Sequence, residues 1–210
     1  MKGPSEALLV IDVQYDFMPG GALPVTRGDE VVPVVNRLMA GFEHVVLTQD
    51  WHPADHVSFA ANHAGRQPFE TLALPYGEQV LWPLHCVQGS AGAALHADLE
   101  VNRARLLIRK GHRRDIDSYS AFVEADRKTS TGLAGYLRES GVRRVWCCGL
   151  ATDYCVAWTA LDARAAGLDA VVVDDACRAI DLDGSLERAW KDMQAAGVGR
   201  MGVEFSCVDG

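Results

Sequence analysis

Short, almost wholly apolar runs alternate along the chain with segments of helical spacing, and this alternation constrains the fold more than any other feature. The run at 7–11 has no polar residue, as expected of a strand with both faces covered. Strands that alternate with helices pair in parallel through right-handed crossovers. The strands are expected at 7–11, 45–48, 106–108, 142–148, 170–173 and 201–205, and the helices at 29–42, 130–139, 152–166 and 183–196.

The predicted fold class is therefore α/β, with a three-layer, doubly wound, six-stranded and mostly parallel sheet that has helices on both faces. The 210 residues suit one domain over 1–210. The segment at about 49–103 interrupts the alternation, because it contains little periodic structure. A loop of that length in a compact domain indicates a function, or short elements that periodicity does not reveal.

Charge and hydropathy argue against two classes of partner. The chain has 20 Lys and Arg against 28 Asp and Glu, a formal net charge of −8 that would repel a phosphate backbone, so no nucleic acid is expected. The longest apolar runs are far too short to span a bilayer, so no membrane is expected either. Nothing in the charge pattern marks a protein partner, and a homo-oligomer stays open.

The cysteine content and the first residues predict where the protein resides. Six cysteines in a chain of this length do not form a disulfide framework and are typical of a reducing compartment. The first residues lead directly into a strand-like run, without the pattern of a signal peptide. We therefore expect a cytoplasmic protein.

Polar residues follow four of the expected strands at the points where they end. Three strands run into Asp12, Asp50 and Lys110, and the fourth runs into a segment that carries Cys155. Ligands of open α/β sheets bind outside the carboxyl ends of the strands, so these side chains are expected at one edge. A thiolate between a base and a lysine is the arrangement that nucleophilic catalysis requires.

Cys155 falls in the first turn of an expected helix for which Thr152 or Asp153 would be the N-cap. The helix dipole contributes roughly 0.3–1 kcal/mol, which lowers a thiol pKa by less than about one unit. Ionisation at neutral pH therefore needs further help, for which Lys110 and Asp12 are the candidates. A plain buried thiol is the alternative for Cys155. The packing interpretation is preferred for the remaining thiols in apolar surroundings, Cys147, Cys148, Cys177 and Cys207.

A second group of polar residues surrounds Asp50. Asp50 and His52 are two residues apart, so on extended chain their side chains point to the same side and can share one ion. His85 would supply a third ligand, and His56 is a candidate for a fourth. One carboxylate with two or three imidazoles suits Zn²⁺, Fe²⁺ or Mn²⁺, with Zn²⁺ as the first choice. The Asp-x-His spacing is common by chance, so a site without an ion is the alternative.

Several stretches together resemble the nicotinamidases (pyrazinamidases) of the isochorismatase-like cysteine hydrolase superfamily, over nearly the whole chain. They lie at 9–17, 48–53, 82–86, 109–122 and 149–156, and the loop at 69–84 is typical of nicotinamidases rather than of the superfamily at large. The resemblance implies a small-molecule substrate: nicotinamide, hydrolysed to nicotinate and ammonia through a cysteine thioester in NAD salvage. Pyrazinamide is a second candidate substrate.

The resemblance also implies roles for individual residues. It assigns the catalytic triad to Asp12, Lys110 and Cys155, and the metal ion to Asp50, His52 and His85, with His56 matching a ligand position that some members use. A cis peptide bond before Ala151 would aim the N–H groups of Ala151 and Cys155 at an oxyanion. The aromatic residues implied to pack on the substrate ring are Phe17, Trp82 and Tyr119.

Two other functions stay open at this point. One is another cysteine amidohydrolase or an isochorismatase of the same superfamily, against which the metal residues argue, because we expect those relatives to lack them. The other is a non-catalytic metal-binding or thiol-redox protein that uses Cys147, Cys148 and Cys155. The sequence does not decide whether the ion activates water or orients the pyridine ring.

Overall fold

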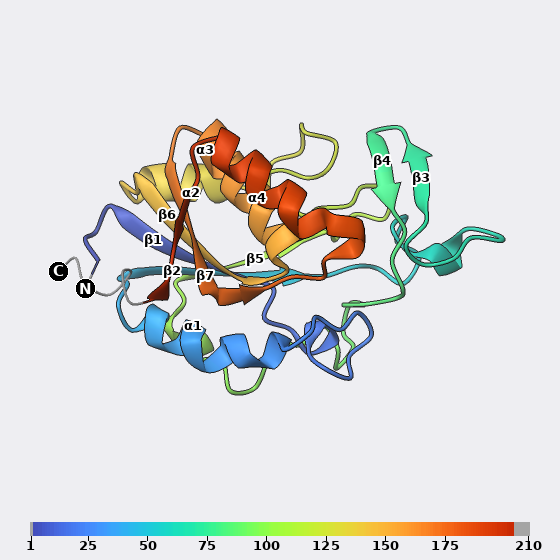
Figure 1. Cartoon of the computed structure of the whole chain (residues 1–210), viewed down its shortest axis with the longest axis horizontal. Coiled ribbons are helices and arrows are strands. Elements are labelled where there is room, and N and C mark those ends of the chain that lie inside the picture. Colours follow the sequence, from blue (N-terminus) through green and yellow to red (C-terminus); the bar gives the residue numbers. More distant parts are fainter. Residues whose placement is uncertain (1, 204–210) are drawn as a thin grey trace.

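The computed structural model describes residues 2–203, which are built on a six-stranded sheet (Figure 1). Every neighbouring pair of strands in this sheet is parallel, so the predicted sheet is confirmed. All of β2 and nearly all of β1 are buried. Burial on both faces explains why β1 after Glu6 and residues 45–47 of β2 are apolar. The strands, in order across the sheet, are β5 (Leu106–Lys110), β2 (His44–Asp50), β1 (Glu6–Ile11), β6 (Arg144–Leu150), β7 (Asp169–Arg178) and β8 (Gly199–Met201).

The last two strands differ from their expected bounds. The strand expected at 170–173 continues to Arg178. The sequence did not reveal this extension because the polar residues Asp174 and Asp175 interrupt the apolar pattern, which resumes in the buried Ala176 and Cys177. The last strand was expected at 201–205, but β8 ends at residue 201, and residues 204 and 205 lie outside the described part of the chain. Cys207, expected to pack in the core, also lies outside it.

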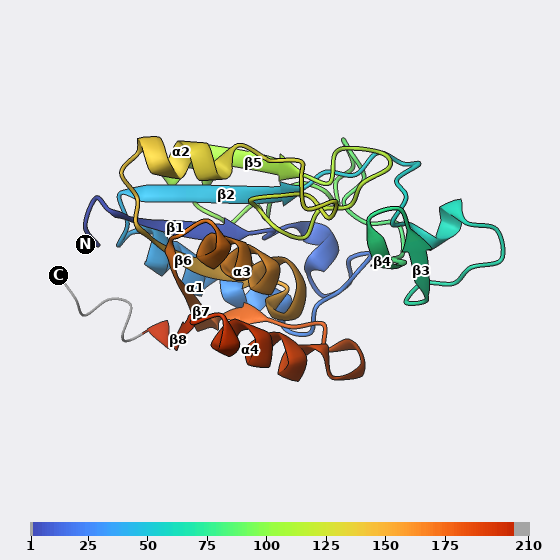
Figure 2. The same cartoon turned by 90° about the horizontal axis from the view of Figure 1, so that it is seen from above.

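Helices cover both faces of the sheet, as predicted (Figures 1 and 2). Helix α1 (Val31–Met39) lies on one face, and α2 (Leu133–Glu139), α3 (Ala157–Ala165) and α4 (Ser185–Ala195) lie on the other. Within the described residues, no helix is both long and apolar enough to cross a membrane.

The long connection between β2 and β5 contains short elements that periodicity did not reveal. Strands β3 (Thr71–Leu74) and β4 (Gly77–Val80) form an antiparallel hairpin, and 3-10 turns cover Ala60–Asn62 and Val101–Arg103. Figures 1 and 2 show that the hairpin stands apart from the main sheet, beyond the carboxyl ends of the main-sheet strands. Four-residue strands are too short for their alternation to be distinguished from a loop.

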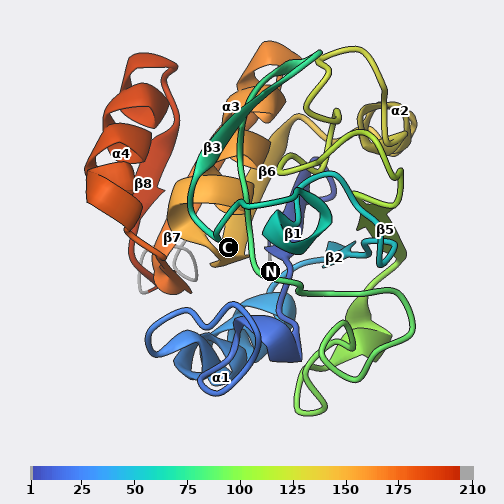
Figure 3. The same cartoon turned by 90° about the vertical axis from the view of Figure 1, so that its right-hand side faces the viewer.

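The order of the strands creates a switch point between β1 and β6. From β1 the chain proceeds to β2 and β5 on one side, whereas β6 leads to β7 and β8 on the other. Connections that diverge in this way leave a crevice at the carboxyl ends of the two central strands. Asp12 follows β1 directly and Cys155 lies just after β6, so both stand at the carboxyl end of the sheet, which faces the viewer in Figure 3.

Candidate active site

Cys155 lies in a π-helical turn, Thr152–Val156, that connects β6 to α3. The expectation of a Thr152 or Asp153 cap is wrong, because Ala151 occupies the N-cap position and no side chain caps the turn. The Asp153 carboxylate instead accepts hydrogen bonds from the N–H groups of Ile180 (3.1 Å) and Asp181 (2.8 Å), which fixes the turn to the loop before α4. The peptide bond between Leu150 and Ala151 is cis, as the family resemblance implies.

Lys110 lies at the centre of a buried polar cluster formed by the ends of β1, β2 and β5 and the turn after β6. Its Nζ lies 2.8 Å from Asp12 Oδ2 and pairs with Asp50 Oδ1. The same ammonium donates to Cys155 Sγ at 3.3 Å and to the Ser118 carbonyl at 3.0 Å. The structure thus brings together the three residues that the sequence nominated for catalysis.

This cluster holds two carboxylates and one ammonium group. Burial alone would lower the pKa of Lys110, but Asp12 and Asp50 raise it well above its ordinary value. Burial alone would raise the pKa of Asp50, but Lys110 lowers it well below its ordinary value. For Asp12 burial prevails, and its pKa is raised although Lys110 opposes the shift. A carboxylate with a raised pKa is suited to accept a proton near neutral pH.

The Cys155 thiol is buried next to the Lys110 ammonium. Burial raises its pKa well above the ordinary value, and Lys110 offsets only part of that shift. The help expected from the helix dipole and Lys110 is therefore insufficient, because the sulfur is buried beside two carboxylates.

Asp12 lies close to the Cys155 thiol. Asp12 and Cys155 belong to a group of residues whose ligand atoms all lie within 4.8 Å of one another. Asp12 Oδ1 accepts a hydrogen bond from Thr48 Oγ1 at 2.6 Å, whereas Oδ2 makes no well-aligned hydrogen bond even though Lys110 Nζ is close. Sequence analysis missed Thr48, although its place two residues before Asp50 on β2 puts both on the same side of that strand.

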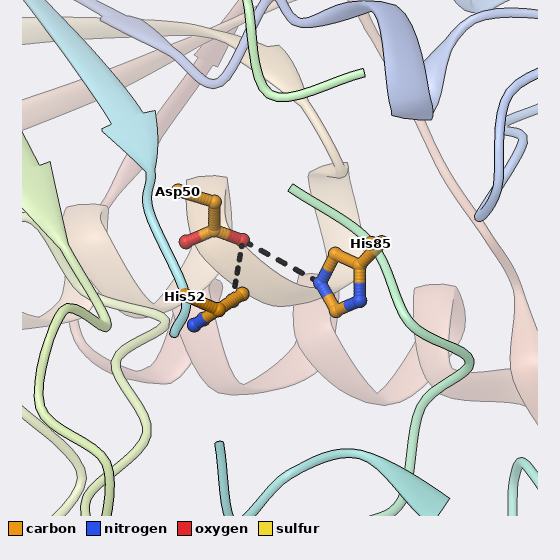
Figure 4. Close-up of side chains that lie close together, drawn as sticks. All are labelled: Asp50, His52 and His85. Atoms are coloured by element: carbon orange, nitrogen blue, oxygen red, sulfur yellow. Dashed lines mark ion pairs between the residues drawn. The ribbon is translucent and has the colours of Figure 1, made fainter. Parts of the chain in front are cut away.

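Asp50, His52 and His85 form a group that fits a divalent ion (Figure 4). Asp50 Oδ2 lies 3.5 Å from His52 Nε2 and 3.8 Å from His85 Nε2. The other ring nitrogens face carbonyl oxygens: His52 Nδ1 lies 2.8 Å from that of Gly111, and His85 Nδ1 lies 2.9 Å from that of Pro83. Because a carbonyl only accepts, both Nδ1 atoms carry the proton and both Nε2 lone pairs are available to a metal.

The structure does not group His56 with Asp50 and His85. His56 lies instead with His52 and Asp117 in a second group. Its Nε2 faces the Ile116 carbonyl at 3.2 Å, and its Nδ1 lies 2.7 Å from Ser58 Oγ. Burial lowers the pKa of His56 to about 4. A neutral imidazole with both nitrogens engaged is the pattern of a structural histidine.

A narrow pocket lies beside Cys155, and Asp50, His52 and His85 are among its lining residues. The three aromatic residues nominated by the resemblance, Phe17, Trp82 and Tyr119, all line it, and so does Ala151. Trp82 Nε1 donates to Tyr119 Oη at 2.9 Å, which fixes two walls relative to each other. Residues that sequence analysis missed also line the pocket: Leu23, Asp117, Tyr154 and Ile180. Tyr154 was detectable as the neighbour of Cys155, but the other three come from connections without a pattern.

The isochorismatase domain model matches residues 6–204, nearly the whole chain. The chain belongs to the isochorismatase family. Within this family, the curated nicotinamidase of Acinetobacter baylyi is 59% identical over 195 residues, which cover 93% of this chain and 91% of the relative.

Solved structures agree with this family membership. A nicotinamidase/pyrazinamidase of Acinetobacter baumanii matches with a TM-score of 0.97 and 56% identity, covering 98% of this chain and 99% of that one. A protein of L. infantum in complex with nicotinate matches with a TM-score of 0.84 and 41% identity, over 96% and 95% of the two chains. The pyrazinamidase of Pyrococcus horikoshii in complex with zinc matches with a TM-score of 0.77 and 38% identity, over 95% and 99%.

Proposed function

We propose that this protein hydrolyses nicotinamide to nicotinate and ammonia, with Cys155 as the nucleophile. The observation that carries the proposal is the buried contact of Cys155 Sγ with Lys110 Nζ, at 3.3 Å, in a cluster that contains Asp12 and borders an aromatic pocket. The identity of 59% with a curated nicotinamidase supports this substrate.

The first half of the reaction forms a thioester. Asp12 takes the thiol proton of Cys155, and the sulfur attacks the carboxamide carbon. The carbonyl oxygen becomes an oxyanion, for which the N–H groups of Ala151 and Cys155 are the proposed donors. Loss of one such donor typically costs about 10²–10³ in rate. Asp12 then gives its proton to the departing nitrogen, the C–N bond breaks and ammonia leaves.

The second half regenerates the thiol. A water attacks the thioester carbon and transfers one proton to Asp12, the C–S bond breaks, and the sulfur recovers that proton. The carboxylic acid that forms releases the water's second proton to solvent and departs as nicotinate. Lys110 contacts Asp12 and the sulfur. Its positive charge therefore stabilises whichever of the two is anionic at each stage.

A divalent ion would be held by Asp50, His52 and His85, next to the pocket. When bound, it would supply a Lewis acid that can polarise a water or bind the ring nitrogen. We propose Zn²⁺, because one carboxylate with two imidazoles suits it and a related pyrazinamidase was crystallised with zinc.

The substrate assignment is tested by ammonia release from a panel of small amides that includes pyrazinamide, and by pyruvate release from isochorismate. We expect nicotinamide to exceed unrelated amides by about 100-fold or more in kcat/KM, because an aromatic pocket selects an aromatic ring. Pyrazinamide should also be cleaved, because it presents a similar ring. Equal turnover of nicotinamide and unrelated aliphatic amides, or faster turnover of isochorismate, would make the assignment wrong.

Removal of the divalent ion provides a second test. Dialysis against a chelator should lower nicotinamide turnover by about 10-fold or more, and Zn²⁺, Fe²⁺ or Mn²⁺ should restore it. Mg²⁺ is the matched control, because it prefers oxygen ligands and should restore little. Full activity in protein shown by elemental analysis to contain no transition metal would contradict a role for the ion.

A thiol-redox function finds no support in the described cysteines. Cys147 and Cys148 are fully buried in β6, and burial raises the pKa of Cys147 to about 12. Thiols of this kind are unreactive.

We also propose a cytoplasmic location. Each of the five described cysteines is free, which is consistent with a reducing compartment.

A further inference from the structure

The side chain of Gln14 is fully buried and pairs with the main chain of Asp50. Its Oε1 accepts a hydrogen bond from the Asp50 N–H at 2.8 Å, and its Nε2 donates to the Asp50 carbonyl at 2.9 Å. Nε2 also donates to the Ala93 carbonyl at 2.9 Å. The carboxamide therefore holds both main-chain polar groups of the residue whose carboxylate faces His52 and His85.

Asp16, two residues further along, holds the main chain next to His85. Its Oδ2 accepts a hydrogen bond from the Cys86 N–H at 2.7 Å. Cys86 has a φ of 47°, in the left-handed region that residues other than glycine rarely adopt. The Cys86 carbonyl accepts from the His52 N–H at 3.0 Å. This unfavourable conformation is thus held on both sides, by Asp16 and by the main chain of another metal residue.

The Asp16 carboxylate lies against Gly92, in the loop that follows His85. A Cβ added at Gly92 would lie 2.1 Å from Asp16 Oδ1, and the Asp16 N–H donates to the Gly92 carbonyl at 2.9 Å. A side chain at position 92 would therefore displace this carboxylate. Alternate residues of one short segment accordingly reach three places: Asp12 enters the Lys110 cluster, Gln14 holds Asp50, and Asp16 holds Cys86.

We propose that Gln14 and Asp16 are positioning residues of the metal group: they hold Asp50 and His85, from distant parts of the chain, in the arrangement that binds the ion. The inference rests on the proposed metal site of Asp50, His52 and His85. Neither residue is itself a ligand in this scheme, since Gln14 uses its amide on main-chain groups and Asp16 Oδ2 is engaged by Cys86. Loss of such outer partners typically lowers metal affinity by about 10- to 100-fold.

The test is the Zn²⁺ affinity of the metal-free protein, measured by competition with a chromophoric chelator. Gln14→Glu keeps an acceptor for the Asp50 N–H, but it loses both N–H donors and sets a carboxylate against two carbonyl oxygens. Asp16→Ala removes the acceptor of the Cys86 N–H. We expect each variant to bind Zn²⁺ about 10- to 100-fold more weakly than the wild type. Asp16→Asn retains an oxygen acceptor, so it should recover most of the affinity that Asp16→Ala loses.

Asn36→Ala is the matched control. Asn36 also uses its amide to hold main-chain groups of the long connection, donating to the Asp98 carbonyl at 2.7 Å and accepting from the Glu100 N–H at 3.0 Å. Neither contact involves a metal residue. This variant should lower the unfolding midpoint of the metal-free protein and leave the Zn²⁺ affinity within about twofold of wild type.

Asp50→Ala separates failure of this inference from failure of the metal site. If Asp50→Ala binds Zn²⁺ as the wild type does, the proposed site and the inference are both wrong. If Asp50→Ala loses binding while Gln14→Glu and Asp16→Ala keep wild-type affinity, only the positioning role is wrong. If both variants fail to fold where Asn36→Ala folds, Gln14 and Asp16 are folding residues, and the positioning role is likewise overturned.

Discussion

Cys155→Ala is expected to lower nicotinamide turnover by about 10⁴-fold or more while the protein stays folded and retains its metal ion. The change removes the sulfur that attacks the carboxamide carbon, and within the described residues no other thiol lines the pocket. The cavity left by one sulfur atom is small, and Cys155 is not among the residues of the metal group with His52 and His85. Ammonia release, circular dichroism and elemental analysis measure the three properties.

Cys147→Ala is the control for a general effect of losing a buried thiol. Cys147 is fully buried in β6 and burial raises its pKa to about 12, so its replacement should cost about 1 kcal/mol of stability and leave turnover nearly unchanged. If Cys155→Ala kept turnover within about 100-fold of the wild type, Cys155 would not be the nucleophile. Equal losses of turnover in the two variants would point to a structural role for both thiols.

The sheet and the residues at its carboxyl edge were predictable because they follow from local patterns. A strand buried on both faces has an apolar run, so β1 and the apolar residues 45–47 of β2 were evident, and the polar residue that ends each strand could be identified directly. Parallel pairing then places Asp12, Asp50 and Lys110 at one edge without further information. This part of the candidate site depends on topology alone.

Other features depend on packing that no local pattern encodes. His56 and His85 both follow the Asp-x-His pair, but the loop directs His85 toward Asp50 and His56 toward the Ile116 carbonyl. The pKa of Cys155 is raised because its sulfur is buried and lies beside two carboxylates, which spacing in the sequence cannot reveal. Gln14 likewise has no signal of its own, because its importance lies in a main-chain contact with Asp50.

Lys110→Met is expected to destabilise the metal-free protein by about 3–5 kcal/mol, in addition to impairing turnover. Lys110 is fully buried and pairs with both Asp12 and Asp50, which are themselves buried. Methionine has a similar length but no charge, so two carboxylates would be left close together in a dry site without a counter-charge. Chemical denaturation of both proteins at pH 7 measures the difference. Lys191→Met, at an exposed position of α4, is the matched control and should change stability by about 0.5 kcal/mol or less.

The pH dependence of the difference in unfolding free energy between the wild type and Lys110→Met shows whether the lost charge causes the destabilisation. In the wild type, Lys110 holds the pKa of Asp50 well below the ordinary 3.8, so this contribution is present above that value and is lost as the pH falls. In Lys110→Met the pKa values of Asp12 and Asp50 should both rise above 3.8, because burial and mutual repulsion then act unopposed. A carboxyl whose pKa is raised in the folded state binds more protons there than in the unfolded state, so it stabilises the fold as the pH falls. The loss of unfolding free energy in Lys110→Met, relative to the wild type, should therefore become smaller as the pH is lowered from neutral toward the ordinary carboxyl pKa. A deficit that stayed constant over this range would mean that Lys110 contributes packing rather than charge.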